Sequence, residues 1–185
     1  MNVVFARERP LSEPPLKAAV IYDDFDFAAR SAALLERAGI RSDDAIQWDV
    51  KPWRLDLLRP SSLAEVALAE TADTDLVVVA LSKTHLLPET LLDWLGRWAE
   101  GRQVRDAALL VLCPEETAGP QSSSGRLQEF AAWHGLMFLE QRHGSDDGDS
   151  LGLLHQLSRR KRPVNPAISW LPDEPEPTRH WGINE

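Results

Sequence analysis

Apolar residues in this chain fall into short runs that are separated by segments with a helical spacing. The runs cover residues 17–22, 45–50, 74–81, 107–112 and 136–139. The run over 74–81 is continuous and rich in β-branched residues, and the run over 107–112 is also apolar without alternation; this pattern is typical of strands that are buried on both faces, as in parallel sheets. The run over 74–81 contains three consecutive valines and lies in the middle of the chain. We therefore expect it to form the central strand.

The segments between the runs carry apolar residues three and four positions apart, which is the spacing of amphipathic helices. Helices are predicted over 27–39, 62–71, 88–101, 127–134 and 151–157. Ser62 and Glu65 match a capping box at the start of the second helix, and Gly39 is placed to end the first. Residues 52–60 are expected to form an irregular connection between the second strand and the second helix.

Strands that alternate with helices predict an α/β fold, namely a three-layer α/β/α sandwich with a five-stranded parallel sheet. Parallel neighbours need crossover connections, and right-handed crossovers place helices on both faces of the sheet. We expect the strand order 2-1-3-4-5, which puts the apolar first and third strands inside the sheet. In sheets of this order, ligands bind beyond the carboxyl ends of the strands, where the first and third strands part.

The chain divides into an irregular lead-in at 1–16, the α/β domain at 17–162 and a proline-rich extension at 163–185. Prolines prevent regular structure in the extension. Two apolar clusters, around Trp170 and Trp181, interrupt its otherwise polar composition. Such clusters dock on their own domain, on a second copy of the chain or on another protein, and the sequence leaves these three alternatives open.

Composition narrows the classes of function. The formal net charge of -9 disfavours nucleic acid as a partner, because an acidic surface repels phosphates. The basic residues at 159–162 are interpreted as a solvated helix end. A single cysteine, Cys113, cannot form an internal disulfide, and no window approaches the roughly 18 to 20 apolar residues of a membrane span. We expect a cytoplasmic protein with a protein partner or a homo-oligomer, and no membrane contact.

Acidic residues follow the first strand directly. Asp23, Asp24 and Asp26 offer the oxygen ligands that a hard cation prefers. Alternatively, Asp24 or Asp26 caps the following helix, and we favour this interpretation while keeping Asp23 and Asp24 as candidate metal ligands. Beyond a weakly bound divalent cation we expect no cofactor. The chain has no G-x-G-x-x-G motif, Walker loop or H-E-x-x-H spacing.

The strongest catalytic candidates follow the central strand, where a hydroxyl group stands beside two basic residues. Ser82 would act as the nucleophile, with Lys83 or His85 as the base. A polar loop at this place is common, and we expect no enzyme. The alternative function is a small enzyme or ligand-binding protein that uses the strand-end rim around Asp23, Asp24, Ser82 and Lys83.

Tryptophans are the candidate contacts for a partner. Trp94 and Trp98 lie one turn apart on the helix predicted over 88–101. We favour packing in the core for both, but exposed tryptophans are frequent hot spots of protein interfaces. With Trp170 and Trp181 they form the set of candidate partner-binding residues.

The order of these features resembles the receiver domains of bacterial response regulators, over residues 17–142. Asp23 and Asp24 resemble the acidic pair that holds Mg²⁺ in that family. Residues 75–80 are similar to its third strand, whose last position is the phosphorylated aspartate. The resemblance implies a flavodoxin-like fold.

Three positions depart from the receiver pattern. Ala80 replaces the phospho-acceptor aspartate, Cys113 the conserved hydroxyl residue and Gln141 the lysine. Alanine has no nucleophile, and its methyl group removes a ligand for Mg²⁺. We therefore expect a degenerate receiver, which is a non-catalytic, non-phosphorylatable protein-interaction module in signalling of the bacterial type.

Overall fold

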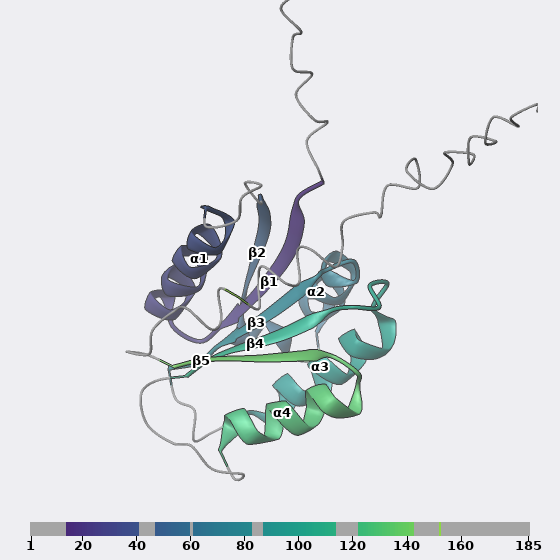
Figure 1. Ribbon diagram of the computed structural model, residues 1–185. Helices are drawn as coiled ribbons and strands as arrows, with labels where there is room; N and C mark the ends of the chain where they lie inside the picture. The colour runs from purple at the N-terminus through teal and green to yellow at the C-terminus, as the bar shows by residue number, and fades with distance from the viewer. Residues whose placement is uncertain are drawn as a thin grey trace, which may run out of the picture.

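The computed structural model describes residues 14–40, 47–59, 61–82, 87–113, 122–142 and 152. Its strands are β1 (Leu16–Tyr22), β2 (Trp48–Arg54), β3 (Leu76–Ala80), β4 (Ala108–Cys113) and β5 (Met137–Arg142). Its helices are α1 (Phe25–Ile40), α2 (Ser62–Thr71), α3 (Glu89–Gly101) and α4 (Ser123–Trp133), with the 3-10 turn η1 (Leu55–Leu58) before α2. The predicted fold is confirmed: the five strands are parallel and follow the order β2-β1-β3-β4-β5, as in flavodoxin-like folds (Figure 1).

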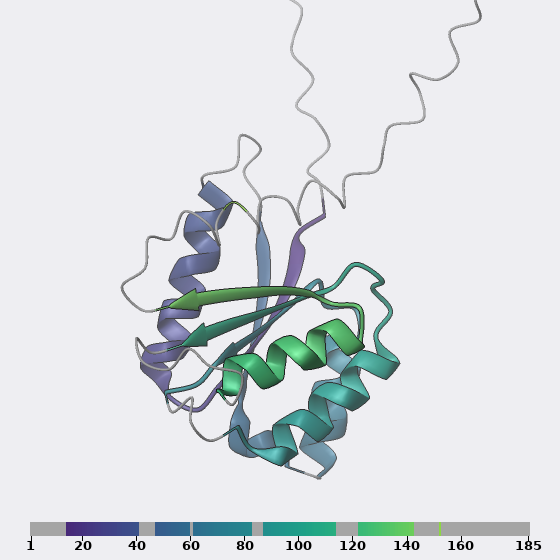
Figure 2. The same ribbon diagram turned by 60° about the horizontal axis from the view of Figure 1, so that its bottom comes forward.

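The helices cover both faces of the sheet. Helix α1 packs on one face, and α2, α3 and α4 pack on the other (Figure 2). Successive residues of β3 point alternately to these two layers: Val77 and Val79 belong to the core under α2–α4, and Val78 to the core under α1. All five residues of β3 are buried, which confirms a central strand covered on both sides.

Trp94 and Trp98 are core residues, with exposed fractions of 2% and 1%. Their indole N–H groups donate to carbonyl oxygens of α2, from Trp94 to Ala64 at 3.4 Å and from Trp98 to Thr71 at 2.9 Å. Both side chains thus join α3 to α2, and a buried indole with an internal acceptor has no surface to offer a partner. The favoured interpretation, packing in the core, is therefore confirmed for Trp94 and Trp98, and the alternative that they bind a partner is not supported.

The second strand differs from its prediction. It was expected over 45–50, but β2 extends to Arg54 and includes Pro52, where the connection was expected to begin. Proline is tolerated because β2 lies at the edge of the sheet, where a strand has a neighbour on one side only. The irregular connection is therefore shorter than predicted and contains η1.

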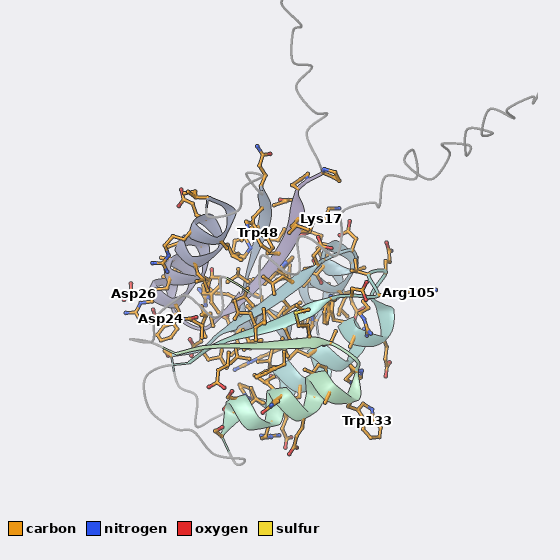
Figure 3. The ribbon with its side chains drawn as sticks, viewed as in Figure 1. Lys17, Asp24, Asp26, Trp48, Arg105 and Trp133 are labelled. Carbon is orange, nitrogen blue, oxygen red and sulfur yellow. The ribbon has the colours of Figure 1, made fainter. Side chains whose placement is uncertain are left out.

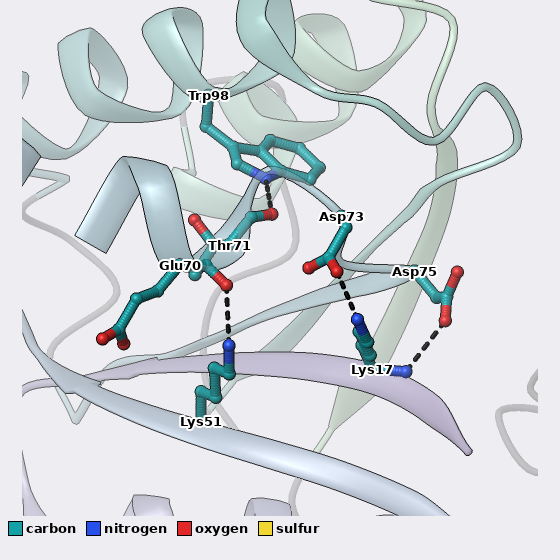
Figure 4. Close-up of polar contacts among 7 residues, drawn as sticks. All are labelled: Lys17, Lys51, Glu70, Thr71, Asp73, Asp75 and Trp98. Carbon is teal, nitrogen blue, oxygen red and sulfur yellow. Dashed lines mark hydrogen bonds and ion pairs between the residues drawn. The ribbon is translucent and has the colours of Figure 1, made fainter. Parts of the chain in front are cut away.

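Polar contacts join the amino end of β1 to the loop before β3 (Figure 4). The backbone N–H of Lys17 donates to Asp75 Oδ2 at 2.8 Å, and its ammonium group pairs with Asp73. The hydrogen bond between the Lys17 ammonium group and the Asp73 carboxylate, reinforced by the attraction between their charges, raises the pKa of Lys17 and lowers the pKa of Asp73. Because the pKa of Asp73 is lowered in the folded state, the contribution of the pair is present near neutral pH and lost in acid. It is small, since both side chains are more than a third exposed.

Candidate functional site

At the carboxyl ends of the strands, paired residues form one row across the sheet. Tyr22, Ala80 and Leu112 are neighbours across β1, β3 and β4, and Gln141 continues the row on β5. The first three side chains pack in the core that faces α1, and Ala80 is entirely buried. The end of β3 therefore presents a methyl group that is surrounded by other buried side chains.

Just beyond this row, Asp23 binds the segment that follows β3. Its Oδ1 accepts the backbone N–H of Ser82 at 2.8 Å, and its Oδ2 accepts the Ser82 hydroxyl at 2.9 Å. The two carboxylate oxygens thus join two segments that are 59 positions apart in the sequence, just beyond the carboxyl ends of β1 and β3. The Asp23 carboxylate and the Ser82 hydroxyl are thus engaged with each other, and the alternative function at the rim stays a prediction.

Asp24 has a different role, at the start of α1. Its Oδ1 accepts the backbone N–H of Asp26 at 2.8 Å, and its carbonyl oxygen accepts the N–H of Ala28 at 3.1 Å. These are the contacts of a helix N-cap, and they confirm the capping interpretation for Asp24. Among the described residues, no group of three or more His, Cys, Asp or Glu side chains is arranged to hold a metal ion. A cation at Asp23 and Asp24 stays a prediction.

The other predicted site residues are placed only in part. Gln141 is buried beside Leu112, and Cys113 pairs with Arg142 at the end of β4. The Cys113 side chain lies outside the described part of the structure. Also outside it are Lys83, His85, Trp170, Trp181, the helix predicted over 151–157 except for residue 152, and the extension at 163–185.

Trp133, the last residue of α4, is not among the predicted site residues. Its side chain is 87% exposed and points away from the body of the domain (Figure 3). The neighbouring Phe130 is half-buried, and the centroid of its ring lies 4.4 Å from the centroid of the His134 ring. The helical spacing contains a signal for this exposure, because Trp133 is off the apolar face formed by positions 127, 130, 131 and 134.

No helix in the described ranges is both long enough and apolar enough to cross a membrane.

The chain matches no protein-family model, and no curated protein is similar to it. Among solved structures, it is similar to the crystal structure of a flavodoxin-like domain from a Synechococcus sp. protein. The sequence identity is 14% and the TM-score 0.44, over 78% of this chain and 99% of that chain. The fold assignment rests on the strand order and the two helical layers described above.

Proposed function

We propose that this protein is a non-catalytic, receiver-like module that acts by binding another protein. The observation that carries this proposal is the buried row formed by Tyr22, Ala80 and Leu112. Phosphoryl transfer of the receiver type needs a carboxylate nucleophile at the end of the third strand, and Ala80 has none. The carboxylates that follow β1 support the same conclusion, because Asp23 binds Ser82 and Asp24 caps α1.

Trp133 is the side chain that we assign to the contact with the partner. A tryptophan exposed to 87% keeps a large apolar area in water, and burial of that area at an interface is favourable. Glu129, one turn before it on α4, is also exposed. An aromatic anchor beside a charged side chain has the composition of an interface hot spot with a polar rim.

Photo-crosslinking in cells tests this assignment. The full chain is produced with a photoreactive phenylalanine analogue in place of Trp133, and the matched control carries the analogue at Ala33, which is exposed on α1. We expect a crosslinked species of discrete mass from position 133 and much less of it from position 33. The absence of an adduct at 133, or an identical pattern from both positions, would refute the partner-binding role.

A further inference from the structure

The outer edge of β2 is an unpaired strand edge in the part of the chain that the structure describes. There β2 pairs with β1 alone, at the end of the sheet (Figure 1). Leu16, which is opposite Trp48 in the register, donates its N–H to the Gln47 carbonyl at 2.9 Å. Alternate residues of a paired strand direct their backbone groups to the same side, so Gln47 and every second residue after it face β1. The residues whose backbone groups face outward are Trp48, Val50, Pro52 and Arg54.

On the face of the sheet that α1 covers, this edge is apolar. The side chains of Trp48 and Val50 line a groove together with one flank of α1, which includes Ile40. Ile40 is 73% exposed. Pro52 is also exposed, and it belongs to the same face of β2 because residues two positions apart share a face. A strand added to β2 would extend the floor of this groove and remove apolar surface from water.

On the opposite face, the same edge carries one charge of each sign. Asp49 is exposed, and the ammonium group of Lys51 donates to the Glu70 carbonyl at the end of α2 at 2.9 Å (Figure 4). Asp49 and Lys51 stand on either side of Val50. When two copies of β2 are placed antiparallel about Val50, each carboxylate therefore lies opposite an ammonium group, an arrangement that favours pairing.

We propose that two copies of this chain pair β2 with β2 in antiparallel orientation, about a two-fold axis at Val50 that joins the two sheets. Val50 then exchanges two backbone hydrogen bonds with Val50 of the second copy, and Trp48 donates its N–H to the Pro52 carbonyl of the second copy. Asp49 lies opposite Lys51 of the second copy, in a non-hydrogen-bonded pair, where side chains are closest. The inference is independent of the proposed function, because Trp133 belongs to α4.

The sequence of β2 disfavours the neighbouring registers. An axis at Asp49 or at Lys51 would place that residue opposite its own copy, and like charges directly opposite each other are destabilising. An axis at Pro52 would leave the centre of the interface without an N–H donor. Proline and charged residues protect edge strands from indiscriminate pairing, and here they leave one register in which the charges attract. This match is a property of β2 with itself, so the occupant that it favours is a second copy.

Sedimentation analysis of the full chain with exchanged charges tests this interface. Lys51→Glu and Asp49→Lys each turn both cross-strand pairs into like-charge pairs, so each is expected to raise the dissociation constant of the dimer about tenfold. The double variant Asp49→Lys/Lys51→Glu brings opposite charges together again and should restore the original constant. Arg105→Glu is the matched control and should have no effect. It changes the net charge as Lys51→Glu does, at an exposed position away from β2 (Figure 3).

Val50→Pro is a second variant, which acts on the backbone. The N–H of Val50 points away from β1, so proline removes the two central hydrogen bonds between the copies and none within the chain. We expect this variant to be a folded monomer at concentrations at which the original chain is a dimer. An original chain that is monomeric at its highest soluble concentration would overturn the proposal. A dimer that Val50→Pro leaves intact, a double variant without rescue, or an equal effect of Arg105→Glu would also overturn it.

Discussion

Replacing Trp98 by alanine is expected to lower the free energy of unfolding by about 3 to 5 kcal/mol, the usual cost of removing a buried tryptophan. The side chain is 1% exposed, and its N–H donates to the Thr71 carbonyl at 2.9 Å. The substitution leaves a cavity between α3 and α2 and removes the donor from a buried carbonyl oxygen. Urea denaturation of the purified chain measures the loss.

Trp133→Ala is the matched control, since it removes the same side chain from a position that is 87% exposed. Its expected cost is below about 0.5 kcal/mol, as for most surface substitutions. Equal losses for the two variants would contradict the division between a core tryptophan on α3 and a surface tryptophan on α4.

Ala80→Asp, which places a carboxylate in the core at the end of β3, is expected to destabilise the fold by about 4 kcal/mol or more. The new carboxylate would be enclosed by Tyr22 and Leu112 in the core that faces α1. Burial disfavours the charged form, so the pKa of the new aspartate should rise above its unfolded value. The loss is therefore greatest near neutral pH and decreases as the pH falls toward the unfolded pKa of about 4.

Urea denaturation at several pH values measures this effect, with Ala33→Asp as the control for the same substitution on the surface of α1. The control should change stability by about 1 kcal/mol or less and show little dependence on pH. If Ala80→Asp were as mild as Ala33→Asp, the end of β3 would border an open pocket, and the account of a filled strand end would fail.

The sheet could be predicted from the sequence because the signal for each central strand is local. Val77, Val78 and Val79 form a run that only a strand covered on both faces accommodates well. The extent of β2 could not be predicted, because Pro52 is acceptable only at a sheet edge and the edge is defined by the pairing of the whole sheet. Local patterns therefore indicated the elements but not all of their limits.

The candidate site was less predictable, for a related reason. The positions of Asp23 and Ser82 at strand ends followed from the fold, but their two hydrogen bonds depend on the register between β1 and β3. Helical spacing placed Trp94 and Trp98 on one face, and only the packing of α2 against that face decides that it is buried. Exposure and contact are properties of the assembled layers, and a single segment does not specify them.

The central claim is that the end of β3 has no acceptor for a phosphoryl group. The most direct test is to incubate the full chain with acetyl phosphate and Mg²⁺ and to measure its intact mass, with an Asp23→Asn variant in parallel. The account predicts that neither protein gains a phosphoryl group. A stoichiometric, acid-labile phosphoryl group on the original chain that is absent from the Asp23→Asn variant would contradict it.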